Sequence, residues 1–135
     1  MAEARHTFPL PSDDTEYLDN AFPGWEALEG GWVLLPCFPI PSGFTTTSTM
    51  AAIQIPPLYP ASPLDMVYFY PAVLRTDGQP IAATNCTQMI DGKSFQRWSR
   101  HYQSSEWQPN EDSIATHVMA IRGWLEKAQP AGAQP

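Results

Sequence analysis

Apolar residues recur at helical spacing near the C-terminal end of the chain. Within residues 112–129 they stand at i, i+4, i+7 and i+11, and they are Ile114, Val118, Ile121 and Leu125. This spacing places them on one stripe of an amphipathic helix, and Asn110 or Asp112 is able to cap its first turn. We therefore predict a helix at 112–127 whose apolar stripe faces a core.

The N-terminal part of the chain carries a second helical pattern. The run DDTEYLDNAF begins at Asp13 with an Asp-x-x-Glu pattern, has acids in its first turn and is followed by Pro23-Gly24. Capping residues at the start and Pro-Gly at the end delimit a short helix. Residues 1–11 form a lead segment, and residues 12–128 are predicted to form one domain.

Three segments between these helices have the composition of strands. Residues 26–36, 45–57 and 65–71 are rich in Val, Ile, Thr and aromatic side chains and are separated by Pro, Gly and Ser turns. Such segments favour an antiparallel meander. We expect an α+β fold in which about four antiparallel strands pack against the C-terminal helix.

Residues 75–111 show no clear period and collect Gly, Pro, Asn, Asp and Ser. A long irregular connection inside a compact domain is uncommon and is usually functional. We therefore expect an irregular functional segment here, and we expect residues 129–135 (QPAGAQP) to be a disordered tail.

Composition narrows the class of protein. The chain has 135 residues, 15 prolines and a net charge of −7, and seven of its 14 acids fall within the first 29 residues. A strongly negative chain is a poor ligand for nucleic acid or anionic membranes. The N-terminus lacks the apolar core of a signal peptide and no apolar run could span a bilayer, so we expect a cytoplasmic protein.

Metal and cofactor sites are not indicated. His6, His101 and His117 are scattered, Cys37 and Cys86 lack metal-ligand spacing, and there is no Gly-rich phosphate loop. We expect neither a metal nor a cofactor. For His117, on the flank of the apolar stripe, two interpretations stay open: a residue of the core, or one that orients a group in the irregular segment.

The stretch QRWSRH (96–101) is the strongest candidate for chemistry. Ser99 lies between Arg97 and Arg100, with His101 at i+2. In an extended segment His101 would lie on the same side as the hydroxyl and could take its proton, while the arginines could hold an oxyanion or a carboxylate. The alternative is a solvated loop whose basic residues, Lys93 included, pair with surface acids.

Two other nucleophiles compete with Ser99. Cys86 has the more reactive side chain, but no basic residue lies within six positions of it, which favours an inert structural thiol. Ser94, after Gly92-Lys93, is the fallback hydroxyl.

The segment IPPLYPASPLDMVYF (55–69) resembles a signature of ubiquitin-conjugating enzymes, in which a Tyr-Pro turn with further prolines lies between two strands. The order of elements is similar too, ending with Trp107-Gln108-Pro109 and an amphipathic helix. In that family the catalytic cysteine lies about eight residues before such a Trp-Xaa-Pro, and the corresponding position here is Ser99. More narrowly, residues 25–127 resemble the bacterial group called prokaryotic family E.

The resemblance implies an acyl carrier of UBC-like fold. Ser99 would accept the C-terminus of a ubiquitin-like protein from a cognate activating enzyme as an oxyester and pass it to a protein target. His101 and Arg97 would be catalytic, whereas Arg100, Lys93 and Trp107 would contact partners. The chain departs from the eukaryotic pattern because it lacks the His-Pro-Asn triplet and the cysteine. An inactive module that only binds a ubiquitin-like protein or an activating enzyme is the alternative.

Overall fold

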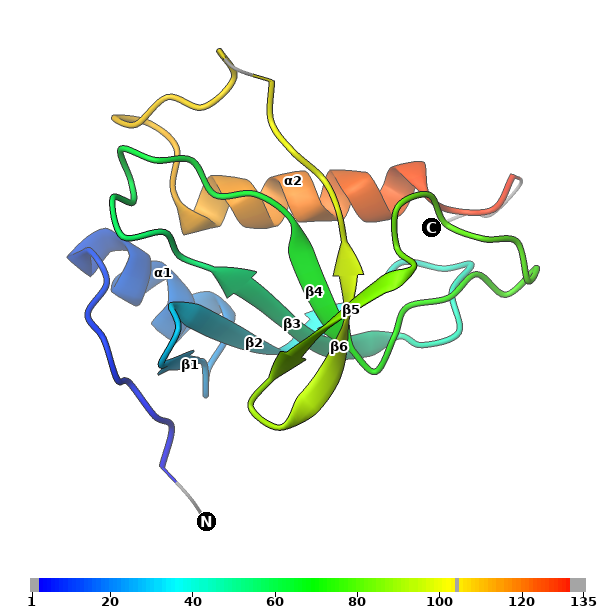
Figure 1. Cartoon of the computed structure of the whole chain (residues 1–135), viewed down its shortest axis with the longest axis horizontal. Coiled ribbons are helices and arrows are strands. Elements are labelled where there is room, and N and C mark those ends of the chain that lie inside the picture. Colours follow the sequence, from blue (N-terminus) through cyan, green and yellow to red (C-terminus); the bar gives the residue numbers. More distant parts are fainter. Residues whose placement is uncertain (1–2, 104, 132–135) are drawn as a thin grey trace.

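The computed structural model describes residues 3–103 and 105–131, so that residues 1–2 of the lead segment and 132–135 of the expected tail lie outside the described residues. Figure 1 shows one long helix, α2, lying across a curled sheet, with the shorter α1 near one end of it. The elements in chain order are α1 (Ser12–Ala21), β1 (Glu26–Leu28), β2 (Trp32–Pro39), β3 (Ser48–Gln54), β4 (Val67–Tyr70), β5 (Cys86–Ile90), β6 (Lys93–Trp98) and α2 (Ile114–Lys127).

The sheet of the described residues has six strands in the order β1-β2-β3-β4-β6-β5, and every neighbouring pair is antiparallel. The predicted α+β class with an antiparallel sheet, a C-terminal helix and a short N-terminal helix is confirmed. The sheet has two strands more than the four expected. Neither helix in the described part of the chain is long and apolar enough to cross a bilayer.

The additional strands come from residues 75–111: the predicted irregular segment is wrong for residues 86–98, and the described residues on either side of them lie in no helix or named strand. β5 and β6 form a hairpin, and its turn residues Asp91 and Gly92 have φ values of 50° and 76°. Two successive residues at positive φ are the mark of a type I′ turn, which Asp-Gly favours. The dipeptide was thus a readable hairpin signal.

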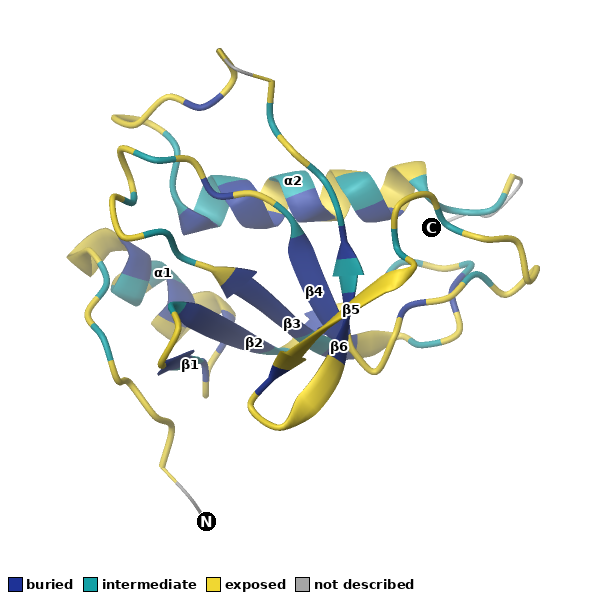
Figure 2. Cartoon of the chain, viewed as in Figure 1, coloured by how far each residue is buried: buried dark blue, intermediate teal, exposed yellow. Residues whose placement is uncertain are grey.

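Apolar side chains cover both faces of the sheet. The larger cluster lies between the sheet and the helices, and the smaller lies on the other face, where it includes Trp32, Tyr68 and Phe95. In Figure 2 the central strands are buried, whereas much of the β5–β6 hairpin is exposed. All members of the predicted α2 stripe are fully buried, namely Ile114, Val118, Ile121 and Leu125.

The first turn of α2 is capped differently from the sequence expectation. Ser113 is the N-cap and forms a capping box with Thr116, so neither Asn110 nor Asp112 fills this position. The Ile114 N–H donates to the Tyr59 hydroxyl at 3.0 Å, and that hydroxyl in turn donates to buried Asp14 of α1 at 2.7 Å. These bonds join the start of α2 to α1 and to the proline-rich β3–β4 loop.

The lead segment joins both edges of the sheet. Arg5 forms ion pairs with Glu26 of edge strand β1 and with Asp91 in the turn beside the other edge strand, β5. Both carboxyl pKa values are lowered by the hydrogen bond from Arg5. The curled sheet is therefore held at its two edges by one side chain, which places the hairpin relative to β1.

Two glycines offer a matched test of the hairpin turn. A Cβ atom added at Gly92 or at Gly123 of α2 meets nothing within 4 Å, but Gly92 has a φ of 76°. Gly92→Ala should therefore lower the free energy of unfolding by about 1 kcal/mol, because an L-residue is strained at positive φ. Gly123→Ala should raise it by up to about 1 kcal/mol, because alanine favours a helix. Urea unfolding measures the change in the free energy of unfolding for both variants. Equal changes would contradict the positive φ of Gly92 in the hairpin turn.

Candidate functional site

Ser99 lies directly after β6, where the strand leaves the sheet. Its N–H donates to the Ala83 carbonyl at 3.0 Å, which holds the backbone at this point. The Ser99 Oγ atom is 3.4 Å from Nε2 of His101. The predicted pair of hydroxyl and imidazole is therefore brought together, at the long end of hydrogen-bond range.

Asp65 completes a chain of three side chains. Its Oδ2 atom is 3.0 Å from Nδ1 of His101. An ionised carboxylate only accepts hydrogen bonds, so Nδ1 of His101 carries the proton and donates it. In the neutral imidazole Nε2 is then left with its lone pair toward the Ser99 hydroxyl. This order of atoms is the one in which a histidine acts as a base toward a serine.

Sequence reasoning missed Asp65, although the residue lies inside the segment 55–69 that carried the family resemblance. It is 36 positions away from His101. It comes close because β4, which begins at Val67, pairs with β6 so that Val67 lies opposite Trp98. The pairing of β4 with β6 is what places Asp65 beside His101, and spacing along the sequence carries no signal of it.

A buried histidine of α2 holds the two segments that carry Asp65 and His101. The Met66 carbonyl accepts a hydrogen bond from His117 Nε2 at 2.9 Å, and the Met66 N–H donates to the Arg100 carbonyl at 2.8 Å. Because Nε2 is the donor, Nδ1 of His117 accepts from the Tyr102 hydroxyl, at 2.5 Å. His117 thus contacts the neighbour of Asp65 and the neighbour of His101, so it belongs to the core and also orients the site.

The protonation state of this network follows from its burial. Desolvation lowers the pKa of His117 to about 4, against the raising effects of the Met66 carbonyl and Asp65. Burial likewise raises the pKa of Tyr102. At neutral pH both groups are uncharged, and their hydrogen bonds have the fixed directions given above.

The basic residues that are close in sequence do not form one patch. Lys93 begins β6, roughly 20 Å of extended chain from Ser99. Arg97 is half-buried within β6, and its Nε atom is buried without a hydrogen-bond partner in the described part of the chain. Arg100 lies over the Trp98 ring, and its Nη1 donates to the carbonyls of Ala82 and Ser99.

The remaining sequence candidates lie apart from the hydrogen-bonded chain. Trp107 is 8% exposed and donates from Nε1 to the Pro60 carbonyl, so it orders the proline-rich loop and offers little surface to a partner. Ser94 is exposed close to the hairpin turn, opposite Met89. Cys86 is exposed on β5, and its thiol has no hydrogen bond to any of the described residues.

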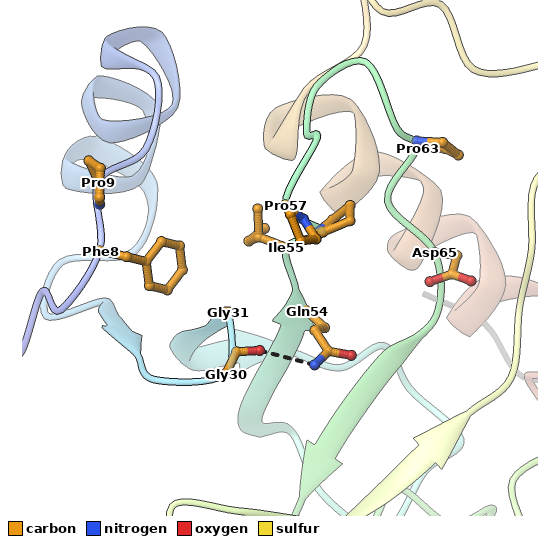
Figure 3. A pocket seen from close by; sticks show the side chains of 10 residues that line it. Phe8, Pro9, Gly30, Gly31, Gln54, Ile55, Pro57, Pro63 and Asp65 are labelled. Atoms are coloured by element: carbon orange, nitrogen blue, oxygen red, sulfur yellow. Dashed lines mark hydrogen bonds between the residues drawn. The ribbon is translucent and has the colours of Figure 1, made fainter.

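Two hollows each include one member of the Ser99–His101–Asp65 chain in their lining. One, of about 820 Å³, has Asp65 in its lining. In Figure 3, the Phe8 ring of the lead segment points toward Ile55 and Pro57, with the Gln54–Gly30 hydrogen bond below them and Asp65 on the far side. The other, of about 430 Å³, has His101 in its lining. Among residues 3–103 and 105–131, no three His, Cys, Asp or Glu side chains are grouped so as to hold a metal ion.

Comparison with protein families gives a match to the family described as Prokaryotic E2 family E, over residues 10–128. Searches among curated proteins and among solved structures gave no significant match. The match extends over α1, the whole sheet and α2, and the α+β architecture agrees with a UBC-like fold. The chain therefore belongs to prokaryotic E2 family E and is a UBC-like module of the conjugating type.

Proposed function

We propose that this protein is an acyl carrier that takes the C-terminus of a ubiquitin-like protein onto Ser99 as an oxyester and transfers it to a protein target. The observation that carries the proposal is the hydrogen-bonded chain of Ser99, His101 and Asp65, with the 3.4 Å and 3.0 Å contacts described above. A module that served only for docking has no need of this chain. Family membership supports the conjugating role, because an E2-like module works with a ubiquitin-like protein and its activating enzyme.

The steps follow from the protonation states. As Ser99 Oγ attacks the acyl carbon that the activating enzyme presents as a thioester, its proton passes to Nε2 of His101. The tetrahedral intermediate collapses by breaking the bond to the enzyme thiolate, which takes the proton from His101. The products are the Ser99 ester and a free thiol, so protons and electron pairs balance. Asp65 keeps Nδ1 protonated and favours the transient imidazolium.

Arg97 is proposed to stabilise the oxyanion. Among the described residues its buried Nε has no acceptor, and an unpaired buried donor gains free energy if the side chain turns so that the guanidinium meets the oxyanion. Arg100 has the second guanidinium near Ser99 and is proposed to contact the incoming partner, together with Lys93. Trp107 is proposed to affect partner binding only indirectly, because its hydrogen bond to the Pro60 carbonyl orders the proline-rich loop.

Intact-mass analysis tests the function directly. The protein is mixed with a ubiquitin-like protein, its cognate activating enzyme and ATP. The expected product is a one-to-one adduct that has lost one water, that survives thiols and that is cleaved by hydroxylamine. Stable docking without any adduct would leave the binding-only module as the function. An adduct that thiols cleave would place the acyl group on a cysteine, and a peptide map would distinguish Cys86 from Cys37, the other exposed free cysteine.

Asp65→Asn is expected to slow formation of the adduct about tenfold in a single turnover, below the roughly 10²–10⁴-fold contribution of a general base. The effect is moderate because the carboxylate and imidazole are 51% and 60% exposed, so water screens their interaction. Asp13→Asn on α1 removes the same charge from an exposed position and is the control. Equal rates for the two variants would contradict the orienting role of Asp65.

A further inference from the structure

Three cationic side chains from separate parts of the chain line the hollow beside His101. Arg75 follows β4, Arg100 follows β6, and Lys127 is the last residue of α2. They are three of only seven Lys and Arg in a chain whose net charge is −7. Folding therefore creates a basic cluster that the sequence island at 93–101 did not predict, and only Arg100 belongs to both.

The positive charge of this hollow is only partly compensated. Arg75 forms an ion pair with Asp77. Lys127 and Arg100 have no carboxylate partner among the described residues, since the hydrogen bonds of Arg100 go to backbone carbonyls. Burial lowers the pKa of Arg100, which means that its charge is partly removed from water. A half-buried cation without a counter-ion is stabilised when an anion approaches it.

The shape and lining favour a peptide as the anion. The volume of about 430 Å³ lies in the range of ligand pockets. Ile81 and Trp124 give the same hollow an apolar part, so an extended segment could place carboxylates on the cations and an apolar side chain between them. Nucleic acid is disfavoured, because three cations neutralise few phosphates while the remaining surface is acidic.

We propose that this hollow binds an acidic segment just before the C-terminus of the ubiquitin-like partner and thereby selects carriers with carboxylates near the acylated end. His101 lines the hollow and also contacts Ser99, so a tail held here has its terminus within reach of the hydroxyl. This inference rests on the proposed function, because it assumes that the C-terminus of the ubiquitin-like partner is the acyl group transferred to Ser99. The recognition itself requires only charge complementarity.

Binding is tested without acyl transfer. The full chain, labelled with ¹⁵N, is titrated with acetyl-Glu-Leu-Glu-Gly amide and with its Gln-Leu-Gln counterpart. The acidic peptide should bind about tenfold more tightly than the neutral one and should shift the signals of Ala82, Ala128 and the Trp124 indole. Its affinity should fall as the salt concentration increases. Equal affinity for the neutral peptide, shifts elsewhere on the molecule, or tighter binding of an oligothymidine would overturn the proposal.

Charge reversal locates the site. Lys127→Glu and Arg75→Glu should each lower the affinity for the acidic peptide by up to about fivefold. The double variant should lower it by about tenfold or more. Arg122→Glu is the matched control, since Arg122 is exposed on the same helix, has the same charge and does not line the hollow. Folding is checked from the spectrum of each variant. An equal loss of affinity in all three single variants would mean that the peptide responds only to the net charge of the protein, and it would overturn the site.

The inference and the proposed function fail in different ways. If the adduct forms on Ser99 but the acidic peptide does not bind at the hollow, the function stands and the acidic-tail site is wrong. If the peptide binds as predicted and no adduct is found with the partner proteins, the site stands as a docking surface and the acyl carrier is wrong.

Discussion

Ser99→Ala is expected to abolish the hydroxylamine-labile adduct completely, while the fold and the docking of partners stay intact. The substitution removes the only atom of Ser99 that can form the ester. It leaves in place the Ser99 N–H bond to Ala83 and the His101–Asp65 pair, which hold the surrounding backbone. The measurement is the mass of the protein after reaction, with far-UV circular dichroism and melting temperature as evidence of folding.

Three further variants define the nucleophile. Ser94→Ala and Cys86→Ala should leave the adduct unchanged, because Ser94 lies by the hairpin turn and the Cys86 thiol has no base bonded to it among the described residues. Ser99→Cys should give an adduct that thiols cleave, because a thioester replaces the oxyester at the same place. A full adduct on Ser99→Ala would disprove the assignment, and its peptide map would identify the hydroxyl that carries the acyl group.

Periodicity predicted the parts of the fold whose stability depends on one continuous face. The α2 stripe could be read because its four residues repeat at the helical spacing and are all buried. The β5–β6 hairpin was missed because β5 is exposed except for Ile90 and so lacks alternation of apolar and polar residues. Its turn was the only strong signal, and a dipeptide at positive φ is easily taken for part of a loop.

The candidate site was predictable only where its residues are neighbours in sequence. Ser99 and His101 are two positions apart, and an extended backbone brings such residues to one side. Asp65 and His117 join them through strand pairing and helix packing, over 36 positions for the first and 51 between His117 and Met66. Long-range contacts of this kind leave no local pattern.

The basic residues illustrate the same point in reverse. Lys93 and Arg100 are close in sequence, yet they lie near opposite ends of β6 because a strand extends by roughly 3.3 Å per residue. Arg75 and Lys127 are distant in sequence and line one hollow with Arg100. A count of charges along the chain therefore identified one member of the spatial cluster and missed two.

Buried His117 should make the stability of the fold depend on pH. Its pKa is about 4 in the folded protein, against an ordinary value of 6.5, because burial opposes the charged form. Between these values the unfolded chain binds more protons than the folded one, so stability rises with pH. The contribution is complete above about pH 6.5 and is lost as the pH falls toward 4, and it amounts to ~3 kcal/mol at about 1.4 kcal/mol per pKa unit.

Urea unfolding at pH 7, 5.5 and 4 should therefore show that the stability advantage of the parent over His117→Gln shrinks by ~3 kcal/mol across this range. Glutamine is a suitable replacement because its amide can donate to the Met66 carbonyl and accept from Tyr102 without titrating. Glu26 and Asp91 have lowered pKa values, so their contributions to stability also fall toward low pH. These contributions are the same in both proteins and therefore cancel in the difference. A difference that stayed constant from pH 7 to 4 would mean that His117 is not held neutral between Met66 and Tyr102, and the fixed support of the Ser99 site would have to come from elsewhere.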